Sequence, residues 1–275
     1  MDCVKILKHC PSPILCLVYG GGMLYAGTNA SVIVVWKDDE YVTTLIDHDE
    51  DEPYAITSLA YGDGVLYSLN YNGIRAWKDN VLINKLTTPR DMVNCIAYHD
   101  GLLYSGGGDI IRIWKNNECI KVLKGHKDKI SCISYVGDTL YSGTNKGRIK
   151  AWQNDICIHD YECYSRVSGL VYGDNLLYSC AYNSIAVWSE NKFKCSLRHN
   201  HGVIVCITYG DGILYSGDDD GDIFMWQNTK FVDNWGNTAR VFSLMYNDGL
   251  LYSGHENGVI KVWKEVGLLT KAALK

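Results

Sequence analysis

Several features that would assign a function directly are missing from this chain. None of its apolar runs reaches the 18 residues of a membrane-spanning helix. The 26 basic residues are outnumbered by 31 acidic ones, and this balance argues against the basic surface that sequence-independent nucleic-acid binding requires. No nucleophile elbow, phosphate-cradling glycine loop, paired-carboxylate motif or Cys-x-x-Cys spacing is found. We therefore expect a protein without cofactor, metal or enzymatic activity, and without a nucleic-acid or membrane partner.

What the chain does have is an internal repeat. Seven tyrosines are each followed six residues later by a second tyrosine, and a tryptophan comes ten or eleven residues after the second one. After a first interval of 42 residues, the copies follow one another every 37 residues. Such a repeat is typical of a stacked or radial array of one supersecondary unit. The first tyrosines are Tyr19, Tyr61, Tyr98, Tyr135, Tyr172, Tyr209 and Tyr246; the second are Tyr25, Tyr67, Tyr104, Tyr141, Tyr178, Tyr215 and Tyr252; the tryptophans are Trp36, Trp77, Trp114, Trp152, Trp188, Trp226 and Trp263.

One repeat contains four short antiparallel strands. In the fourth copy the segments 130–135, 139–143, 148–152 and 156–160 are apolar or alternating stretches separated by turn residues. In four other copies the first turn contains Asp-Gly, which supplies the positive φ angles of a primed hairpin turn. Four such strands form one propeller blade. The sequence therefore predicts an all-β, seven-bladed propeller of four-stranded antiparallel blades.

The hairpin register explains the tyrosine spacing. With this turn the first tyrosine lies opposite a leucine and the second lies opposite a small residue, as in the pairs Tyr61–Leu66 and Tyr67–Ala60. Each pair places one ring on each face of its blade. We expect the fourteen rings to fill the space between neighbouring blades.

The N-terminal residues are predicted to close the ring. Residues 2–8 match residues 118–124, the fourth strand of an internal blade, whereas the last repeat ends at Trp263 without a fourth strand of its own. The N-terminal strand would complete the last blade and remove the exposed sheet edge. We expect one propeller domain over residues 1–264. The C-terminal tail 265–275 would lie outside it as a docking helix, an added strand or a disordered end.

The cysteines and the first apolar stretch fit a cytoplasmic protein. Of the eleven cysteines, Cys16, Cys95, Cys132 and Cys206 share one repeat position, where other copies carry serine or glycine. A position that accepts these three residue types requires a small side chain rather than a disulfide, so we expect reduced thiols. The apolar stretch 13–18 has the composition of a signal-peptide core, but it recurs in all seven copies and is interpreted as a strand.

The fourth copy carries a family resemblance. Its Lys124-Gly125-His126, the Leu-Tyr-Ser-Gly run 140–143 and the Ile-Lys-Ala-Trp run 149–152 resemble the WD-repeat (WD40) β-propeller family. The Leu-Tyr-Ser-Gly form is similar to WD-repeat domains attached to some protist myosin-heavy-chain kinases and ubiquitin ligases. The resemblance implies the propeller fold and a role in protein binding. The chain departs from the family in lacking the Trp-Asp dipeptide, and the family's buried His/Ser/Asp/Trp network is incomplete in every copy.

The candidate binding residues come from positions that do not recur. Blades expose two faces: the turn face carries the near-identical first turns, and the variable face carries the second turns and the loops between blades, where function usually lies. Lys129, Arg166 and Arg240 stand just before the innermost strand on the variable face, and Arg90 and Arg198 lie in nearby loops. We expect the first three to face the mouth of the central channel. Converging basic groups suit carboxylates or phosphates, although solvated rim charges would show the same pattern.

Other unusual segments have plainer explanations. The acidic run 47–52 in the first inter-blade loop is interpreted as solvated, with attraction of a basic partner or masking of the channel mouth as alternatives. The acidic turn 218–222 lacks EF-hand spacing, so calcium is disfavoured. His9, Cys10, Cys163, His199 and His201 fall in equivalent loops of different blades, which disfavours zinc. Trp235 is interpreted as core.

These observations favour a non-catalytic interaction scaffold or adaptor. Its variable face and channel mouth would bind an acidic or phosphorylated segment of another protein, with the chain as a monomer or as part of a hetero-complex. A propeller enzyme or small-ligand receptor that uses the channel is one alternative. A structural subunit of a larger assembly, marked by a broad apolar patch, is another.

Overall fold

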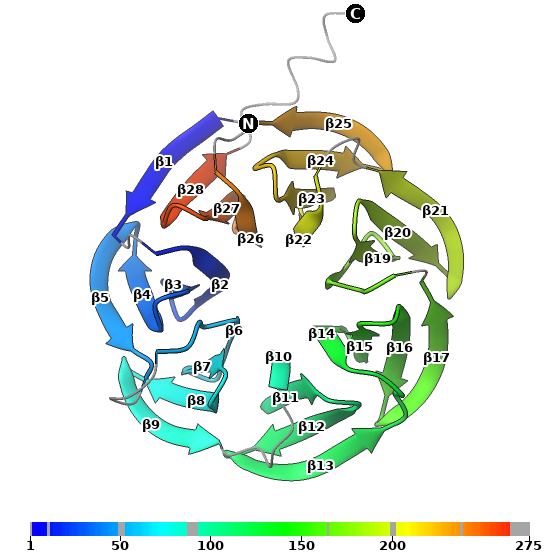
Figure 1. The fold of residues 1–275 in the computed structure, drawn as a ribbon, viewed down its shortest axis with the longest axis horizontal. Helices are drawn as coiled ribbons and strands as arrows, with labels where there is room; N and C mark the ends of the chain where they lie inside the picture. Colours follow the sequence, from blue (N-terminus) through cyan, green and yellow to red (C-terminus); the bar gives the residue numbers. More distant parts are fainter. Residues whose placement is uncertain are drawn as a thin grey trace, which may run out of the picture.

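The strands of this protein form a ring. The computed structural model describes residues 2–9, 12–48, 53–86, 93–163, 165–198, 202–236 and 239–264. These residues form seven four-stranded antiparallel sheets, β1 to β28, arranged radially about one axis (Figure 1). The described part of the chain holds no helix that could cross a membrane. The predicted fold class, a seven-bladed all-β propeller, is confirmed.

Each blade is built from one repeat, with its first strand nearest the axis and its fourth strand outermost (Figure 1). The first strands of blades 1 to 7 are β2 (Ile14–Gly20), β6 (Ser58–Gly62), β10 (Val93–His99), β14 (Ile130–Val136), β18 (Gly169–Gly173), β22 (Ile204–Gly210) and β26 (Val241–Asn247). The second strands are β3 (Met23–Thr28), β7 (Val65–Asn70), β11 (Leu102–Gly107), β15 (Thr139–Thr144), β19 (Leu176–Ala181), β23 (Ile213–Asp218) and β27 (Leu250–His255). The third strands are β4 (Val32–Lys37), β8 (Gly73–Lys78), β12 (Ile110–Lys115), β16 (Arg148–Gln153), β20 (Ser184–Ser189), β24 (Ile223–Gln227) and β28 (Val259–Lys264). The fourth strands are β5 (Glu40–Ile46), β9 (Val81–Leu86), β13 (Glu118–Lys124), β17 (Ile156–Glu162), β21 (Lys192–Arg198), β25 (Lys230–Trp235) and, for blade 7, β1 (Asp2–Lys8).

The N-terminal strand closes the ring as predicted. Strand β1 pairs antiparallel with β28, from Asp2 opposite Lys264 to Lys8 opposite Val259. Its Leu7 is buried in a cluster that includes Ile14 of blade 1 and Ile260 of blade 7. The first and last segments of the described chain are therefore held in one sheet. The C-terminal tail 265–275 lies outside the described residues.

The turn chemistry agrees with the sequence. In the turn between the first and second strands, Asp63 and Gly64 have φ angles of 49° and 77°. Asp38 and Asp39, between the third and fourth strands, have φ angles of 49° and 63°. Two successive positive φ angles are the mark of a primed turn, whose twist matches that of the flanking strands. Both kinds of turn lie on the turn face.

The tyrosines fill the space between blades. The register pairs Tyr61 with Leu66 and Tyr67 with Ala60, as predicted. At five of the seven boundaries the second tyrosine of one blade stacks on the first tyrosine of the next; Tyr67 and Tyr98 have ring centroids 5.7 Å apart, and Tyr215 and Tyr246 have the same separation. These pairs bind adjacent blades together through apolar contact.

The small-residue position also packs between blades. A Cβ built on Gly27 would lie 2.5 Å from Sγ of Cys16 and 2.7 Å from Cγ2 of Ile56 in the next blade. Burial raises the pKa of Cys16 and of Cys95 to about 12, so these thiols stay protonated. The ten described cysteines are free thiols. The position takes Cys, Ser or Gly because nothing larger fits.

Candidate binding site on the variable face

A buried hydrogen bond holds the third strand of most blades to the second. The tryptophan Nε1 donates to a serine Oγ in the second strand, whereas blade 1 has Ala26 at the serine position. The donor–acceptor pairs and their distances are Trp77–Ser68 2.8 Å, Trp114–Ser105 2.8 Å, Trp152–Ser142 2.8 Å, Trp188–Ser179 2.9 Å, Trp226–Ser216 3.0 Å and Trp263–Ser253 2.8 Å. These bonds fix the second turns on the variable face.

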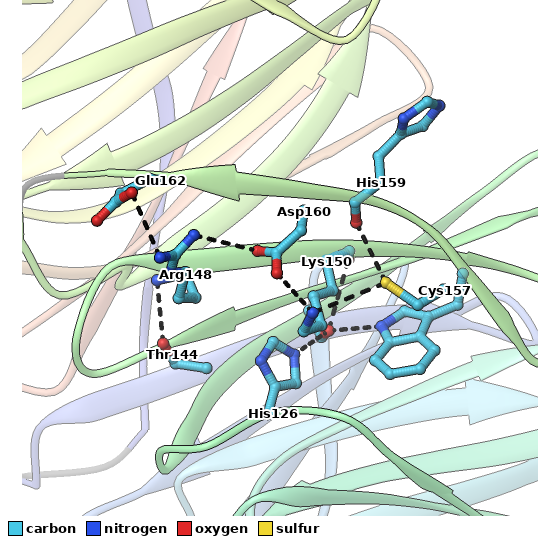
Figure 2. Close-up of polar contacts among 10 residues, drawn as sticks. His126, Thr144, Arg148, Lys150, Cys157, His159, Asp160 and Glu162 are labelled. Atoms are coloured by element: carbon cyan, nitrogen blue, oxygen red, sulfur yellow. Dashed lines mark hydrogen bonds and ion pairs between the residues drawn. The ribbon is translucent and has the colours of Figure 1, made fainter.

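The partner of the serine differs from blade to blade. In blade 4 the ring of His126 lies beside the Ser142 hydroxyl, with Nε2 2.7 Å from Oγ (Figure 2). In blade 7 the corresponding group is His255, whose Nε2 lies 2.8 Å from Oγ of Ser253. His255 belongs to strand β27 rather than to a loop, so a comparison of loop positions did not find it. Blade 7 thus rebuilds the Trp–Ser–His part of the network from another position.

Both histidines are held neutral at physiological pH. Burial, together with the neighbouring Lys150 ammonium, lowers the pKa of His126 to about 4 (Figure 2). Burial likewise lowers the pKa of His255 to about 4, against the effect of its bond to the Ala239 carbonyl. A neutral imidazole accepts at one ring nitrogen and donates at the other. These rings therefore serve as structural links in the blade.

Blade 2 uses a buried ion pair in the same place. Asp47 is fully buried and lies against the guanidinium of Arg75, while Asn70 Nδ2 donates to the Asp47 carbonyl at 3.0 Å. Burial raises the pKa of Asp47, and hydrogen bonds from Ser68 and Arg75 oppose that rise. The interpretation of residues 47–52 as one solvated acidic run is therefore wrong for Asp47, which is part of the core. Residues 49–52 lie outside the described residues.

Three of the five predicted binding residues stand next to the mouth. Lys129 and Arg240 have exposed side chains, and their carbonyls accept from the backbone N–H groups of Asn145 and Glu256 in the second turns. This contact places both residues on the variable face beside the innermost strands. Arg166, also exposed, precedes β18. No ion pair or hydrogen bond joins the side chains of these three residues to any other described residue.

The two remaining predicted residues do not join this group. Arg198 is the last residue of the outermost strand β21, paired with Ser184, and so lies at the outer rim rather than in a loop near the mouth. Arg90 falls outside the described residues. Of the five, the described residues Lys129, Arg166 and Arg240 thus lie beside the innermost strands of blades 4, 5 and 7.

Two basic residues of blade 4 have acidic partners. On the outer part of blade 4, Arg148 and Lys150 of β16 reach across to acidic side chains of β17 (Figure 2). Lys150 Nζ lies 2.7 Å from Asp160 Oδ2, and Arg148 Nη2 lies 3.3 Å from Glu162 Oε2. Among the described residues, no such acidic partner is found for Lys129, Arg166 or Arg240.

Arg166 separates two cavities at the mouth. The larger, of about 550 Å³, reaches from Tyr54 and Tyr71 of blade 2 across Asn94 and Asn145 to Arg166. The second, of about 470 Å³, is bordered by Arg166 and Tyr182 of blade 5 and by Val203 and Val205 of blade 6. One guanidinium can therefore contact a ligand in either cavity.

Tyrosines at the mouth were not identified from the sequence. Tyr71 and Tyr182 occupy the second turns of blades 2 and 5 and are 67% and 65% exposed. The ring of Tyr54 lies 4.9 Å from that of Tyr71. The sequence does distinguish these three tyrosines, because none of them belongs to the fourteen repeating tyrosines. Exposed tyrosines beside an arginine are typical of protein-binding surfaces.

The channel wall below the mouth has two chemical sides. One position of the innermost strand carries Thr57, Asn94, Ser131 and Ser168 in blades 2 to 5. The same position carries Val205, Phe242 and Leu15 in blades 6, 7 and 1. The polar arc lies below the larger cavity, and the apolar arc begins at the second. An extended ligand with one polar and one apolar side fits this division.

The remaining candidates are structural. Among the described residues no group of three or more His, Cys, Asp or Glu side chains is placed to hold a metal ion. In the acidic turn 218–222, Asp218 is buried and its Oδ1 accepts from the backbone N–H of Asp222 at 2.8 Å. Trp235 stacks on Trp263 of the next blade at 5.6 Å, which confirms its interpretation as core.

Comparisons with known proteins agree with this architecture. The profile of the WD domain, G-beta repeat family matches residues 117–153. No curated protein matches the chain by sequence. The WD40 β-propeller domain of Doa1 is similar in structure, with a TM-score of 0.83 and 16% identity over 95% of this chain and 96% of that one.

A second solved structure extends the comparison. The computationally designed Ika8 protein is similar with a TM-score of 0.73 and 21% identity, over 94% of this chain and 98% of that one. Solved chains match this fold in large number, 1330 in all, so the fold alone selects no function. The closed ring of seven blades is thus a β-propeller, and its residues 117–153 match the profile of a WD repeat.

Proposed function

We propose that this protein is a non-catalytic interaction module, a scaffold or adaptor that binds an acidic or phosphorylated segment of another protein at the mouth of its channel. The observation that carries the proposal is the position of Arg166. Its side chain borders two cavities and makes no ion pair or hydrogen bond with the described residues. The free thiols suit a protein of the reducing cytoplasm, where we place this interaction.

The chemistry of the mouth supports such a ligand. A guanidinium offers parallel N–H donors that match both oxygens of a carboxylate or phosphate. Tyr71 and Tyr182 provide large contact areas with few rotatable bonds, so ordering them on binding costs little entropy. Lys129 and Arg240 add positive charge that draws an acidic segment toward the mouth and raises its association rate.

A direct test compares three peptides that differ only at one central residue: phosphoserine, glutamate or glutamine. We expect the phosphorylated and acidic peptides to bind the wild-type chain, and Arg166→Ala to weaken both by about tenfold or more, as for a charge-assisted contact. Arg166→Lys keeps the charge but not the paired donors, so its affinity for these peptides should lie between those of the wild type and Arg166→Ala. Isothermal titration calorimetry measures all three affinities.

The matched control moves the same charge change to the other face. The triple variant Lys129→Ala/Arg166→Ala/Arg240→Ala and the variant Lys37→Ala/Lys78→Ala/Lys115→Ala each remove three positive charges, and the second set lies at strand ends on the turn face. A loss of peptide affinity in the first variant alone supports binding at the channel mouth. Equal affinity of the glutamine and phosphoserine peptides, or equal loss in both variants, contradicts it. Partners captured from native cytosol should follow the same pattern.

A further inference from the structure

Two clefts of the same construction open on the turn face. One, of about 440 Å³, lies between blades 3 and 4, and the other, of about 340 Å³, lies between blades 7 and 1. Each is lined by equivalent residues of its two blades, and the boundaries lie nearly opposite each other in the ring (Figure 1). We name them the 3/4 cleft and the 7/1 cleft. The equivalent residues of the 3/4 and 7/1 clefts are His99 and Asn247, Asp100 and Asp248, Leu102 and Leu250, Tyr104 and Tyr252, Tyr135 and Tyr19, Leu140 and Leu24, Trp152 and Trp36, Asn154 and Asp38, and Asp155 and Asp39.

The position after the first tyrosine distinguishes these boundaries from the glycine boundaries. In blades 1, 2, 5 and 6 it is glycine, and the tyrosine of the next blade packs directly on it: a Cβ built on Gly62 would lie 1.8 Å from Cδ1 of Tyr98. In blades 3 and 7 the position holds His99 and Asn247. A side chain there occupies the space that the next tyrosine ring takes elsewhere.

The displaced tyrosines show the effect. The ring of His99 stacks on that of Tyr135 at 3.9 Å. Tyr135 is tilted by 41° from Tyr104, whereas the pair Tyr67–Tyr98 is within 18° of parallel. At the 7/1 boundary no ring contact joins Tyr252 to Tyr19, both of which are described. The two clefts therefore coincide with the two boundaries at which a polar side chain replaces the glycine.

Displacement also changes what the turn aspartates bind. At two of the glycine boundaries the tyrosine hydroxyl donates to the aspartate of the preceding turn: Tyr98 donates to Asp63 at 2.8 Å and Tyr246 to Asp211 at 2.7 Å. No such bond joins Tyr135 to Asp100 or Tyr19 to Asp248 among the described residues. Blade 4 also lacks the glycine, with Val136 in its place, yet Tyr141 and Tyr172 stay stacked within 18° of parallel, and its turn has Gly137 instead of the aspartate. Among the described residues, only the two clefts thus combine displaced rings with carboxylates that lack this tyrosine bond.

Each cleft already holds one ammonium group of its own chain at the rim. Lys121 of β13 pairs with Asp155 at the 3/4 cleft. Lys5 of β1, the equivalent residue, pairs with Asp39 at the 7/1 cleft, with Nζ 3.4 Å from Oδ2. No ion pair joins the other cleft carboxylates, Asp100, Asp138, Asp248 and Asp38, to a described residue. The clefts thus bind a cation where the chain supplies one and have carboxylates left for another.

We propose that the 3/4 and 7/1 clefts bind arginine side chains of a partner protein, which makes the turn face a second docking surface of opposite charge preference to the channel mouth. A guanidinium is planar and stacks on aromatic rings, and here Tyr104, Tyr135 and His99 supply rings beside the carboxylate of Asp100. This proposal does not depend on the function of the variable face.

A peptide titration tests the assignment. The probe is the blocked pentapeptide Gly-Gly-Arg-Gly-Gly, and the comparison peptide has glutamine in place of arginine. With the isotope-labelled full chain, we expect the arginine peptide to shift the backbone amide resonances of Asp100 and Gly101 and those of Asp248 and Gly249. We expect His99→Gly, which lets Tyr135 settle on the glycine and removes no charge, to weaken binding at the 3/4 cleft by about fivefold, the size of a lost cation–π contact. The 7/1 cleft serves as the internal control in the same sample.

Further variants keep the test decisive. Asp100→Asn should weaken binding of the arginine peptide at the 3/4 cleft, and Asn247→Gly should weaken it at the 7/1 cleft. Asp79→Asn removes a charge from the turn face outside both clefts, at a position where other blades carry asparagine, and should leave both affinities unchanged. Equal shifts with the glutamine peptide, shifts spread over all seven blades, or unchanged affinity in His99→Gly and Asp100→Asn would overturn the proposal. Spermidine that binds more tightly than the arginine peptide would replace the partner protein with a small polyamine and likewise overturn it.

Discussion

The carboxylate of Asp47 and the guanidinium of Arg75 form an ion pair that solvent hardly reaches: the two residues are 0% and 4% exposed. Asp47 follows the outermost strand of blade 1, and Arg75 belongs to the third strand of blade 2. The pair therefore joins neighbouring blades at the place where blade 4 uses His126. It also anchors the start of the longest inter-blade loop, where the chain leaves the outermost strand of blade 1.

Removal of one partner of this pair should be costly. In Arg75→Met the carboxylate of Asp47 stays buried without its counter-charge, and we expect the free energy of unfolding to fall by about 3–5 kcal/mol. Arg148→Met is the matched control, because Arg148 pairs with Asp160 and Glu162 at the exposed edge and its loss should cost less than about 1 kcal/mol. Urea unfolding monitored by tryptophan fluorescence measures both. Similar losses in the two variants would show that burial of the pair has no energetic consequence.

The double variant Asp47→Leu/Arg75→Met distinguishes the cost of an unpaired buried charge from the net contribution of the ion pair. It removes both charges and replaces them with apolar groups, so most of the stability lost in Arg75→Met should return. A double variant less stable than Arg75→Met would mean that the hydrogen bonds of Asp47 to Asn70 and Ser68 matter more than the charge itself.

Stability should fall as the pH drops from about 6.5 to about 4. The folded chain holds His126 and His255 neutral because burial lowers each pKa to about 4, whereas the unfolded chain protonates them near 6.5. Below 6.5 the unfolded state therefore binds more protons, and each histidine reduces the free energy of unfolding by up to about 1.4 kcal/mol per pH unit. Protonation of Asp47, whose pKa is raised, acts in the opposite sense.

A substitution isolates the histidine contribution. His255→Asn removes one titrating group, so its loss of stability between pH 7 and pH 5 should be smaller than that of the wild type, although its stability at pH 7 is lower. His159→Asn is the control, since this ring points away from the blade (Figure 2). Parallel pH profiles for wild type and His255→Asn would mean that the buried ring does not govern acid sensitivity.

The recurring parts of the fold could be predicted from the sequence, because seven copies of the repeat show which residue types each structural position accepts. The primed turns, the opposition of Tyr61 to Leu66 and the closing pair of β1 with β28 all follow from residue spacing and turn chemistry. Of the candidate site, Lys129, Arg166 and Arg240 were found because they depart from that pattern at one position.

The features that escaped prediction depend on contacts between different positions. The burial of Asp47 follows from Arg75, 28 residues away, and not from the acidic residues next to it. His255 replaces a loop histidine from within a strand. Spacing shows which positions recur, but it does not show which side chains from different positions meet.

Loss of the N-terminal strand should open the ring. Deletion of residues 2–8 leaves β28 with an unpaired edge and exposes the cluster that Leu7 covers. We expect the melting temperature to fall by about 10 °C or more, since a few kcal/mol corresponds to that shift in a chain of this size. The control Val4→Ser/Ile6→Ser changes only exposed side chains of the same strand and should melt within a few degrees of wild type. A deletion that melts like the wild type would contradict closure by β1.

Substitutions at the position after the first tyrosine should change stability in opposite directions at the closed boundaries, where it is glycine, and at the open boundaries, where it is His99 or Asn247. In Gly62→Ala the new Cβ would meet the ring of Tyr98 at 1.8 Å, so the ring must move and its hydroxyl must leave Asp63. We expect the free energy of unfolding to fall by about 2–3 kcal/mol, from overpacking together with the lost hydrogen bond.

His99→Gly makes the reverse change, since it frees the space that Tyr135 needs to reach Asp100. Its stability should equal or exceed that of the wild type by up to about 1 kcal/mol, despite the flexibility that glycine adds to the unfolded chain. Calorimetric melting of the two variants gives the answer: if Gly62→Ala is as stable as the wild type, or if His99→Gly is as damaging as Gly62→Ala should be, the tyrosine does not require the glycine and the two clefts have another origin.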